Sequence, residues 1–163
     1  FFQILAETLK KAGKSDADIE KLGYQRSFSI YDDDDQMSVI KQILKEQNLG
    51  DKAYPPREIK SAISDAKNRL LTPKEWLKEK QNDFRSKKIA EVFEAYEKTL
   101  KNNNALDFDD LLVKTIKLLL DHPPVLQYYQ NKFSYILVDE YQDTNPAQYD
   151  LIRLLSGSKL NLC

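Results

Sequence analysis

An apolar run near the C-terminal end of the chain, Tyr135-Ile136-Leu137-Val138, leads directly into Asp139-Glu140-Tyr141-Gln142-Asp143-Thr144-Asn145. A short, continuously apolar run is typical of a strand buried in a parallel sheet. Ligands of open α/β sheets bind beyond the carboxyl ends of such strands. Residues 135–138 are therefore expected to form a strand that places Asp139 and Glu140 in a nucleotide site.

The two adjacent acids fit the chemistry of phosphoryl transfer. A nucleoside triphosphate is used together with Mg²⁺, which a carboxylate helps to hold, and hydrolysis needs a group that orients or deprotonates the attacking water. Asp139 is the candidate for the metal and Glu140 is the candidate for the water. The alternative is a strand that runs into a polar turn, and the short pattern apolar-apolar-Asp-Glu is more often explained that way on its own.

The rest of the sequence has mainly helical periodicity. Apolar side chains recur at helical spacing through residues 84–100, and Asp107 is expected to cap a helix over residues 108–120. The acidic run at residues 32–35 is expected to complement a helix N-terminus rather than to bind a metal. Further helices are expected over residues 5–12, 15–22, from 33 or 34 to 44, from 55 to 70, and from 72, 123 and 145 onward.

The composition allows a packed core and excludes several kinds of site. The chain has 163 residues, of which 41% are hydrophobic and 31% are charged, enough for one domain. No apolar stretch reaches the length needed to cross a membrane. The lone His122 and the lone Cys163 cannot form a zinc site, an internal disulfide or a Cys-His dyad. We expect a cytoplasmic protein.

Charge is unevenly distributed along the chain. The formal net charge is -1, yet residues 57–88 contain ten basic residues against five acids. A basic helical stretch of this kind can contact a phosphate backbone. Mixed charges on solvated helices are also common, so the charge pattern alone leaves both explanations open.

Residues 138–145, Val-Asp-Glu-Tyr-Gln-Asp-Thr-Asn, resemble motif II of the UvrD/PcrA/Rep-type superfamily 1 DNA helicases, a Walker B motif. Two further strings, residues 106–112 and 28–32, resemble the segment before motif II and the start of the family's 1B accessory subdomain. Within motif II, the resemblance implies that Asp139 binds Mg²⁺, that Glu140 activates water, and that Gln142 and Asp143 organise the nucleotide site.

The resemblance also implies a fold and an activity for the whole protein. We expect a mainly α fold, with a helical 1B-like accessory subdomain over residues 1–130, whose ends can belong to 1A, and a short parallel β piece of the RecA-like α/β motor over residues 131–163. The implied protein is an ATP-dependent helicase that uses ATP and Mg²⁺. It translocates 3′ to 5′ on single-stranded DNA and unwinds duplex at a junction, in DNA repair or replication.

The Walker A phosphate loop, Gly-x-x-x-x-Gly-Lys-Ser/Thr, does not occur in this sequence. The string Gly13-Lys14-Ser15 has Thr8 where the first glycine would stand, and a helix end followed by a Ser cap explains it better. We therefore expect an excised piece of the helicase that neither binds ATP well nor hydrolyses it, with no cofactor of its own.

Two other interpretations remain at this stage. The nearer one is a helicase-nuclease subunit of the RecB/AddA kind, which shares a motif II of this type. The other is a non-catalytic helical module that binds DNA or protein and carries a degenerate motif II.

Overall fold

The computed structural model describes residues 18–80 and 83–157. The chain divides into two compact units. The first, the terminal unit, combines residues 1–27 with residues 110–163; the second, the insert unit, is Phe28–Asp109. The expected helix at residues 5–12, the string Gly13-Lys14-Ser15 and the stretch 160–163 lie outside the described residues.

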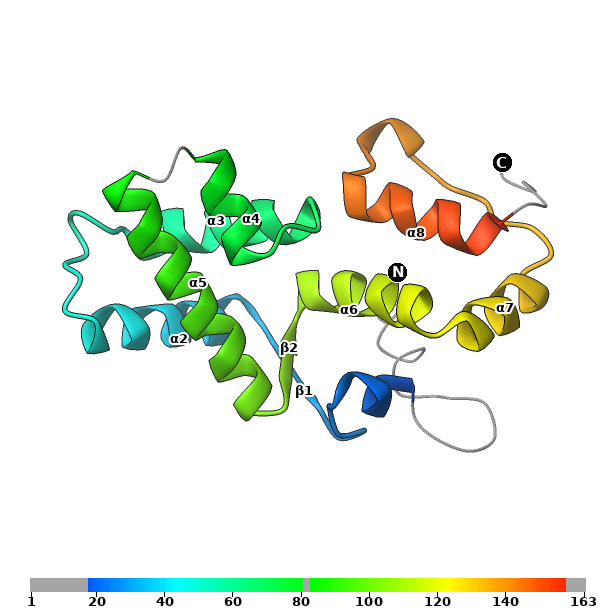
Figure 1. Ribbon diagram of the computed structural model, residues 1–163, viewed down its shortest axis with the longest axis horizontal. Coiled ribbons are helices and arrows are strands. Elements are labelled where there is room, and N and C mark those ends of the chain that lie inside the picture. The colour runs from blue at the N-terminus through cyan, green and yellow to red at the C-terminus, as the bar shows by residue number, and fades with distance from the viewer. Residues whose placement is uncertain (1–17, 81–82, 158–163) are drawn as a thin grey trace. The chain divides into compact units, whose positions relative to one another are not determined.

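The insert unit begins and ends with two short strands that pair with each other. In chain order it contains β1 (Ser29–Tyr31), α2 (Asp33–Glu46), α3 (Pro56–Asn68), α4 (Pro73–Glu79), α5 (Phe84–Asn102) and β2 (Ala105–Asp107) (Figure 1). The strands are parallel, with Ser29 opposite Ala105 and Tyr31 opposite Asp107. Parallel neighbours need a long crossover, and here the four helices provide it.

The helices of the insert unit begin where the sequence predicts them. Asp32 caps α2, because its Oδ1 accepts hydrogen bonds from the backbone N–H groups of Asp34 and Asp35 at 2.9 and 3.0 Å. The expectation that the acidic run serves a helix start is therefore confirmed. Thr72 and Glu75 form the same reciprocal capping arrangement at the start of α4.

The core of the insert unit lies among α2, α3, α4 and α5. In Figure 1, α5 is drawn in green and crosses α2, against which it packs. The stripe predicted for residues 84–100 is buried as expected. Members of this core include Ile40, Leu44, Ile59, Ile63, Trp76, Phe93, Tyr96 and Leu100.

The terminal unit is also mainly helical. Its described elements are η1 (Asp18–Leu22), α6 (Phe108–Asp121, which begins two residues before the unit does), α7 (Pro123–Lys132), η2 (Tyr141–Asp143) and α8 (Pro146–Ser156). Helices α7 and α8 are in contact, and Gln130 Nε2 donates a hydrogen bond to the Leu154 carbonyl at 2.7 Å. Within residues 18–80 and 83–157, every helix is too short or too polar to span a bilayer.

The mainly helical fold with a small parallel β piece is confirmed, but different residues form the strands. Residues 135–138 are extended, and only Ile136 among them makes a bridge of the β type. A strand ladder needs a neighbour for each backbone N–H and C=O group. The neighbour expected for this segment, residues 160–163, lies outside the described residues, so that pairing stays a prediction.

The predicted boundary at residue 130 concerned the subdomains of the helicase family and also stays a prediction. The compact units instead divide the chain after residues 27 and 109. Residues 110–130 therefore fall in the same unit as the acidic motif.

Candidate functional site

The extended segment before the two acids has one face on α8 and one face in solvent. Tyr135 and Leu137 are 76% and 82% exposed, whereas Ile136 and Val138 are half-buried. This alternation is the period of an extended chain, whose successive side chains point to opposite sides. The segment therefore rests on the terminal unit through alternate residues and leads to Asp139 at its end.

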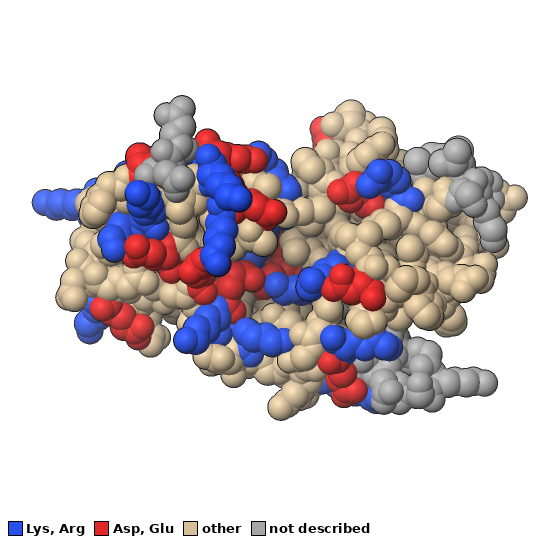
Figure 2. Space-filling model, in the orientation of Figure 1, with Lys and Arg blue, Asp and Glu red and all other residues tan. Residues whose placement is uncertain are grey.

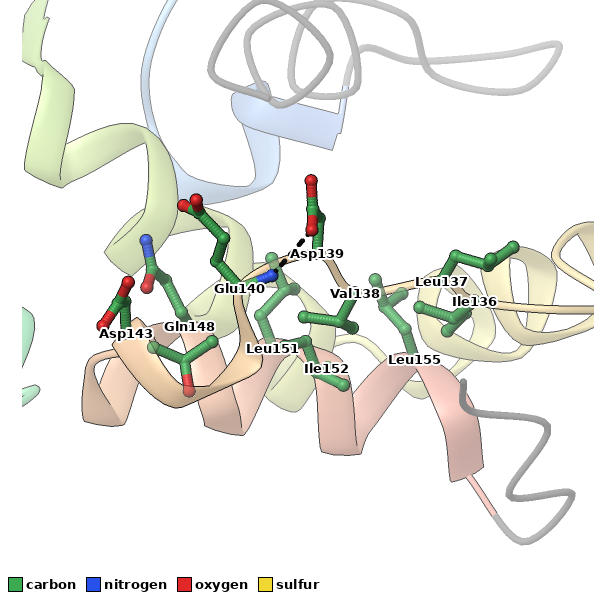
Figure 3. Close-up of a pocket in the computed structure, with 11 residues that line it drawn as sticks. Ile136, Leu137, Val138, Asp139, Glu140, Asp143, Gln148, Leu151, Ile152 and Leu155 are labelled. Atoms are coloured by element: carbon green, nitrogen blue, oxygen red, sulfur yellow. Dashed lines mark hydrogen bonds between the residues drawn. The ribbon is translucent and has the colours of Figure 1, made fainter.

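A left-handed turn follows the segment. Glu140 has φ 51° and ψ 44°, a conformation that residues other than glycine seldom adopt. Its backbone N–H donates to Asp139 Oδ1 at 3.0 Å (Figure 3). Holding a side chain in this region costs on the order of 1 kcal/mol, and such strain often accompanies functional sites.

The turn exposes both predicted carboxylates. Asp139 and Glu140 are exposed, and Figure 3 shows their side chains pointing away from α8. Each carboxylate has two oxygens with about four acceptor positions. Asp139 therefore keeps acceptor capacity for a cation after it has accepted the Glu140 N–H.

Gln142 and Asp143 lie in the short helix η2 that follows the turn. Both are exposed, and the Asp143 backbone N–H donates to the Glu140 carbonyl at 2.9 Å. Thr144 ends η2, and its hydroxyl donates to the Tyr141 carbonyl at 2.8 Å. The structure thus keeps all four predicted residues within one compact turn between the extended segment and α8.

Helix α8 is fixed at its start by a capping box. The Gln148 backbone N–H donates to Asn145 Oδ1 at 2.8 Å, and the Asn145 N–H donates to Gln148 Oε1 at 3.0 Å. Pro146 occupies the first turn, where its missing N–H costs nothing. Ala147 and Leu151 are buried, so the first turns of α8 are held both by the cap and by packing.

A cavity of about 470 Å³ lies between the acidic turn and α8 (Figure 3). Asp139, Glu140 and Asp143 line it together with apolar side chains of the extended segment and of α8. Gln142 is not among its lining residues. The sequence predicted the acids and a helix from residue 145 onward, but it did not predict that Thr144 and Gln148 line the cavity, although Asn145-x-x-Gln148 is a recognisable capping signal. The complete lining is Ile136, Leu137, Val138, Asp139, Glu140, Asp143, Thr144, Gln148, Leu151, Ile152 and Leu155.

The carboxylates suit Mg²⁺ only as part of a larger ligand set. Mg²⁺ in phosphoryl-transfer sites is held by one or two carboxylates, while substrate phosphates and water complete its shell. Asp139 and Glu140 supply this kind of donor, exposed and adjacent. Among the described residues, no group of three or more His, Cys, Asp or Glu side chains could hold a metal ion. Two adjacent carboxylates are the kind of protein ligand that Mg²⁺ takes where substrate phosphates and water supply the rest of its shell.

The class of the chain is that of a helicase N-terminal domain. Residues 2–163 match the family model described as UvrD/REP helicase N-terminal domain. The chain belongs to this family, and the resemblance predicted from residues 138–145 is confirmed.

Curated relatives include the ATP-dependent DNA helicases PcrA of two staphylococci. The chain is 51% identical over 146 residues to the protein of Staphylococcus epidermidis, and 50% identical over 146 residues to that of Staphylococcus aureus. Each alignment covers 90% of this chain and 20% of the relative. The chain thus spans about a fifth of the length of the relatives that it matches.

Proposed function

We propose that the chain carries the metal-facing and water-facing carboxylates of an ATP-dependent DNA helicase. The observation that carries the proposal is the acidic turn: Asp139 and Glu140 stand exposed and adjacent at the end of an extended segment, in a string of motif II type. Family membership and 51% identity to an ATP-dependent DNA helicase support it. The helicase would translocate 3′ to 5′ on single-stranded DNA and unwind duplex.

Each residue of the turn has a distinct role in this proposal. Mg²⁺ bound with ATP would neutralise charge on the β- and γ-phosphates. The Asp139 carboxylate would hold that ion, and Glu140 would orient the attacking water and take its proton. Gln142 and Asp143 would organise the site from η2. The left-handed backbone at Glu140 supports this assignment, because it turns the second carboxylate outward directly beside the first.

The two compact units suggest how the subdomains are divided. We infer that the insert unit, residues 28–109, is the helical accessory subdomain, and that residues 110–157 belong with the motif II segment in the motor subdomain. The basic residues within 57–88 would let the accessory subdomain help to guide DNA.

The test of the catalytic assignment is Glu140→Gln in the full-length helicase. Loss of the base without loss of the metal ligand should reduce DNA-stimulated ATP hydrolysis by about 10²-fold or more, the range of general-base contributions. Binding of a fluorescent ATP analogue should be retained. Glu94→Gln, an exposed change on α5, is the matched control and should leave both measurements unchanged. Unwinding at the normal rate by the Glu140→Gln protein would contradict the assigned role.

The proposed function also leads to a prediction for the 163-residue chain alone. Its sequence has no glycine-rich phosphate loop, so it should bind MgATP weakly and show no DNA-stimulated hydrolysis. Turnover that copurifies with the chain and disappears in Glu140→Gln would show that the chain is self-sufficient.

A further inference from the structure

A buried lysine stands at the C-terminal end of α3, in the insert unit. Lys67 is 4% exposed, and its Nζ lies 2.7 Å from Asp107 Oδ2 and 2.7 Å from Glu97 Oε1. Asp107, the last residue of β2, is 1% exposed. Removing an ion pair from water to this degree costs desolvation free energy that can equal the Coulombic attraction between its charges. Stability alone therefore does not explain why charged groups occupy this position.

The cluster joins three elements of the insert unit at one point. Tyr96 of α5 donates its hydroxyl hydrogen to the same Asp107 Oδ2, at 3.0 Å, and its ring centroid lies 5.2 Å from Lys67 Nζ. Lys67 comes from α3, Tyr96 and Glu97 from α5, and Asp107 from β2. Each group is directional, so together they fix the position of Asp107 more narrowly than apolar packing would.

Asn68, the residue after Lys67, binds Asp109, which lies where the chain leaves the insert unit. Asn68 Nδ2 donates to Asp109 Oδ1 at 3.2 Å and to the Ser64 carbonyl at 3.0 Å. Successive residues of α3 thus bind Asp107 and Asp109, on either side of Phe108, where β2 passes into α6. Besides these contacts, the exit strand is held by a ladder of three residue pairs with β1 and by the burial of Ala105 and Leu106.

We propose that Lys67 is a positioning residue that acts through Asp107 to fix where the chain leaves the insert unit. In this proposal, which rests on the proposed function, DNA held by the insert unit affects the ATP site through this exit. Asp107 continues directly into α6, which belongs with the motif II segment. In this proposal the polar cluster is either formed, as in the structure, or broken, because an element with two discrete arrangements can carry coupling between distant sites.

The structural half of the proposal is tested by hydrogen exchange on the full chain. In Lys67→Met, backbone amides of residues 105–109 should lose protection, while those of α2 keep theirs. Lys41→Met is the matched control: Lys41 is an exposed lysine of α2 and lies outside residues 57–88. Tyr96→Phe removes only the hydroxyl and should give the same local pattern more weakly, even if Lys67→Met fails to fold. Uniform loss of protection throughout the insert unit in Tyr96→Phe, or none in residues 105–109, would overturn the proposal.

The coupling half is tested by ATP hydrolysis in the full-length helicase. Tyr96→Phe and Lys67→Met should lower the stimulation of hydrolysis by DNA by about fivefold or more, the lower end of allosteric coupling. The unstimulated rate and the affinity for ATP should match those of Lys41→Met. Equal losses in stimulated and unstimulated rates would mean that the cluster is merely structural, and would overturn the proposal. Failure of the proposed function is distinguishable, because it would already appear as absent hydrolysis in the unmodified helicase.

Discussion

At the scale of single residues, two carboxylates, Asp83 and Glu75, accept local hydrogen bonds at helix starts. The Ser86 hydroxyl and backbone N–H donate to Asp83 at 2.5 and 3.0 Å, and these bonds hold the pKa of the Asp83 carboxyl below its usual 3.8. Hydrogen bonds from the Thr72 hydroxyl and backbone N–H likewise lower the pKa of Glu75 from 4.5. Both acids cap helix N-termini, where the charged form is favoured.

The Asp83 cap should make stability dependent on acid. The pKa of Asp83 is lower in the folded chain than in the unfolded chain. The stabilisation is therefore fully present at pH values above the pKa of the unfolded chain, and it is lost as the pH falls through the pKa of the folded chain. Urea midpoints at pH 6 and pH 3 should therefore differ more for the unmodified chain than for Asp83→Asn, which caps without titrating. An equal pH dependence in the two proteins would show that the cap contributes nothing to acid unfolding.

At the scale of elements, helix starts were predictable from the sequence and the strands were not. The caps at Asp32, Thr72 and Asn145 depend on side chains within three residues of the helix start, so local sequence carries the signal. The pairing of β1 with β2 joins three-residue strands that are far apart in the chain, and no local pattern marks it. The apolar run at 135–138 gave a strand signal, but only Ile136 pairs in the described structure.

The candidate site could likewise be predicted only in part from the sequence. The identities of Asp139, Glu140, Gln142 and Asp143 follow from the motif string, because the residue types carry the chemistry. The left-handed backbone at Glu140 does not follow, since glutamate gives no preference for positive φ. The buried Lys67–Asp107 pair was also missed, because lysine and aspartate are ordinarily surface residues.

Helix α8 offers a test of cap energetics beside the site. Asn145→Ala should destabilise the chain by about 1 kcal/mol, a typical value for an N-cap, and Asn145→Asp should retain most of the stability. Asn131→Ala, an exposed change within α7, is the control and should shift the free energy of unfolding by less than about 0.5 kcal/mol. Equal effects of the two alanine changes in urea titrations would mean that the capping box does not hold α8.

At the scale of the whole molecule, basic residues are numerous but are often paired. Five of the ten in residues 57–88 have a carboxylate partner: Lys60, Lys67, Arg69, Arg85 and Lys88. Figure 2 shows the blue and red groups interspersed over this part of the insert unit. Apart from the buried pair of Lys67, these are surface ion pairs, which are weak and can exchange partners. Local pairing therefore reduces, without abolishing, the attraction of the insert unit for phosphates.

DNA binding by the chain alone should be weak and sensitive to salt. Fluorescence anisotropy with labelled single-stranded and duplex DNA should show affinity falling steeply as salt is raised, because phosphate contacts release counterions. Lys74→Gln with Lys78→Gln, exposed residues of α4, should weaken binding further, whereas Lys41→Gln with Lys45→Gln on α2 should not. Tight binding that persists at high salt would place the interaction on a different surface.

The parallel pairing of β1 and β2 has a consequence for the order in which the chain assembles. Ser29 meets Ala105 only after the intervening helices have been made, and closing so long a loop is entropically costly unless those helices have already shortened it. During synthesis the first strand must therefore wait, unpaired, while α2 to α5 collapse locally and quickly. We therefore expect the sheet to form after the helices have packed. A slow phase in refolding should then follow the pairing of the two strands rather than the formation of the helices.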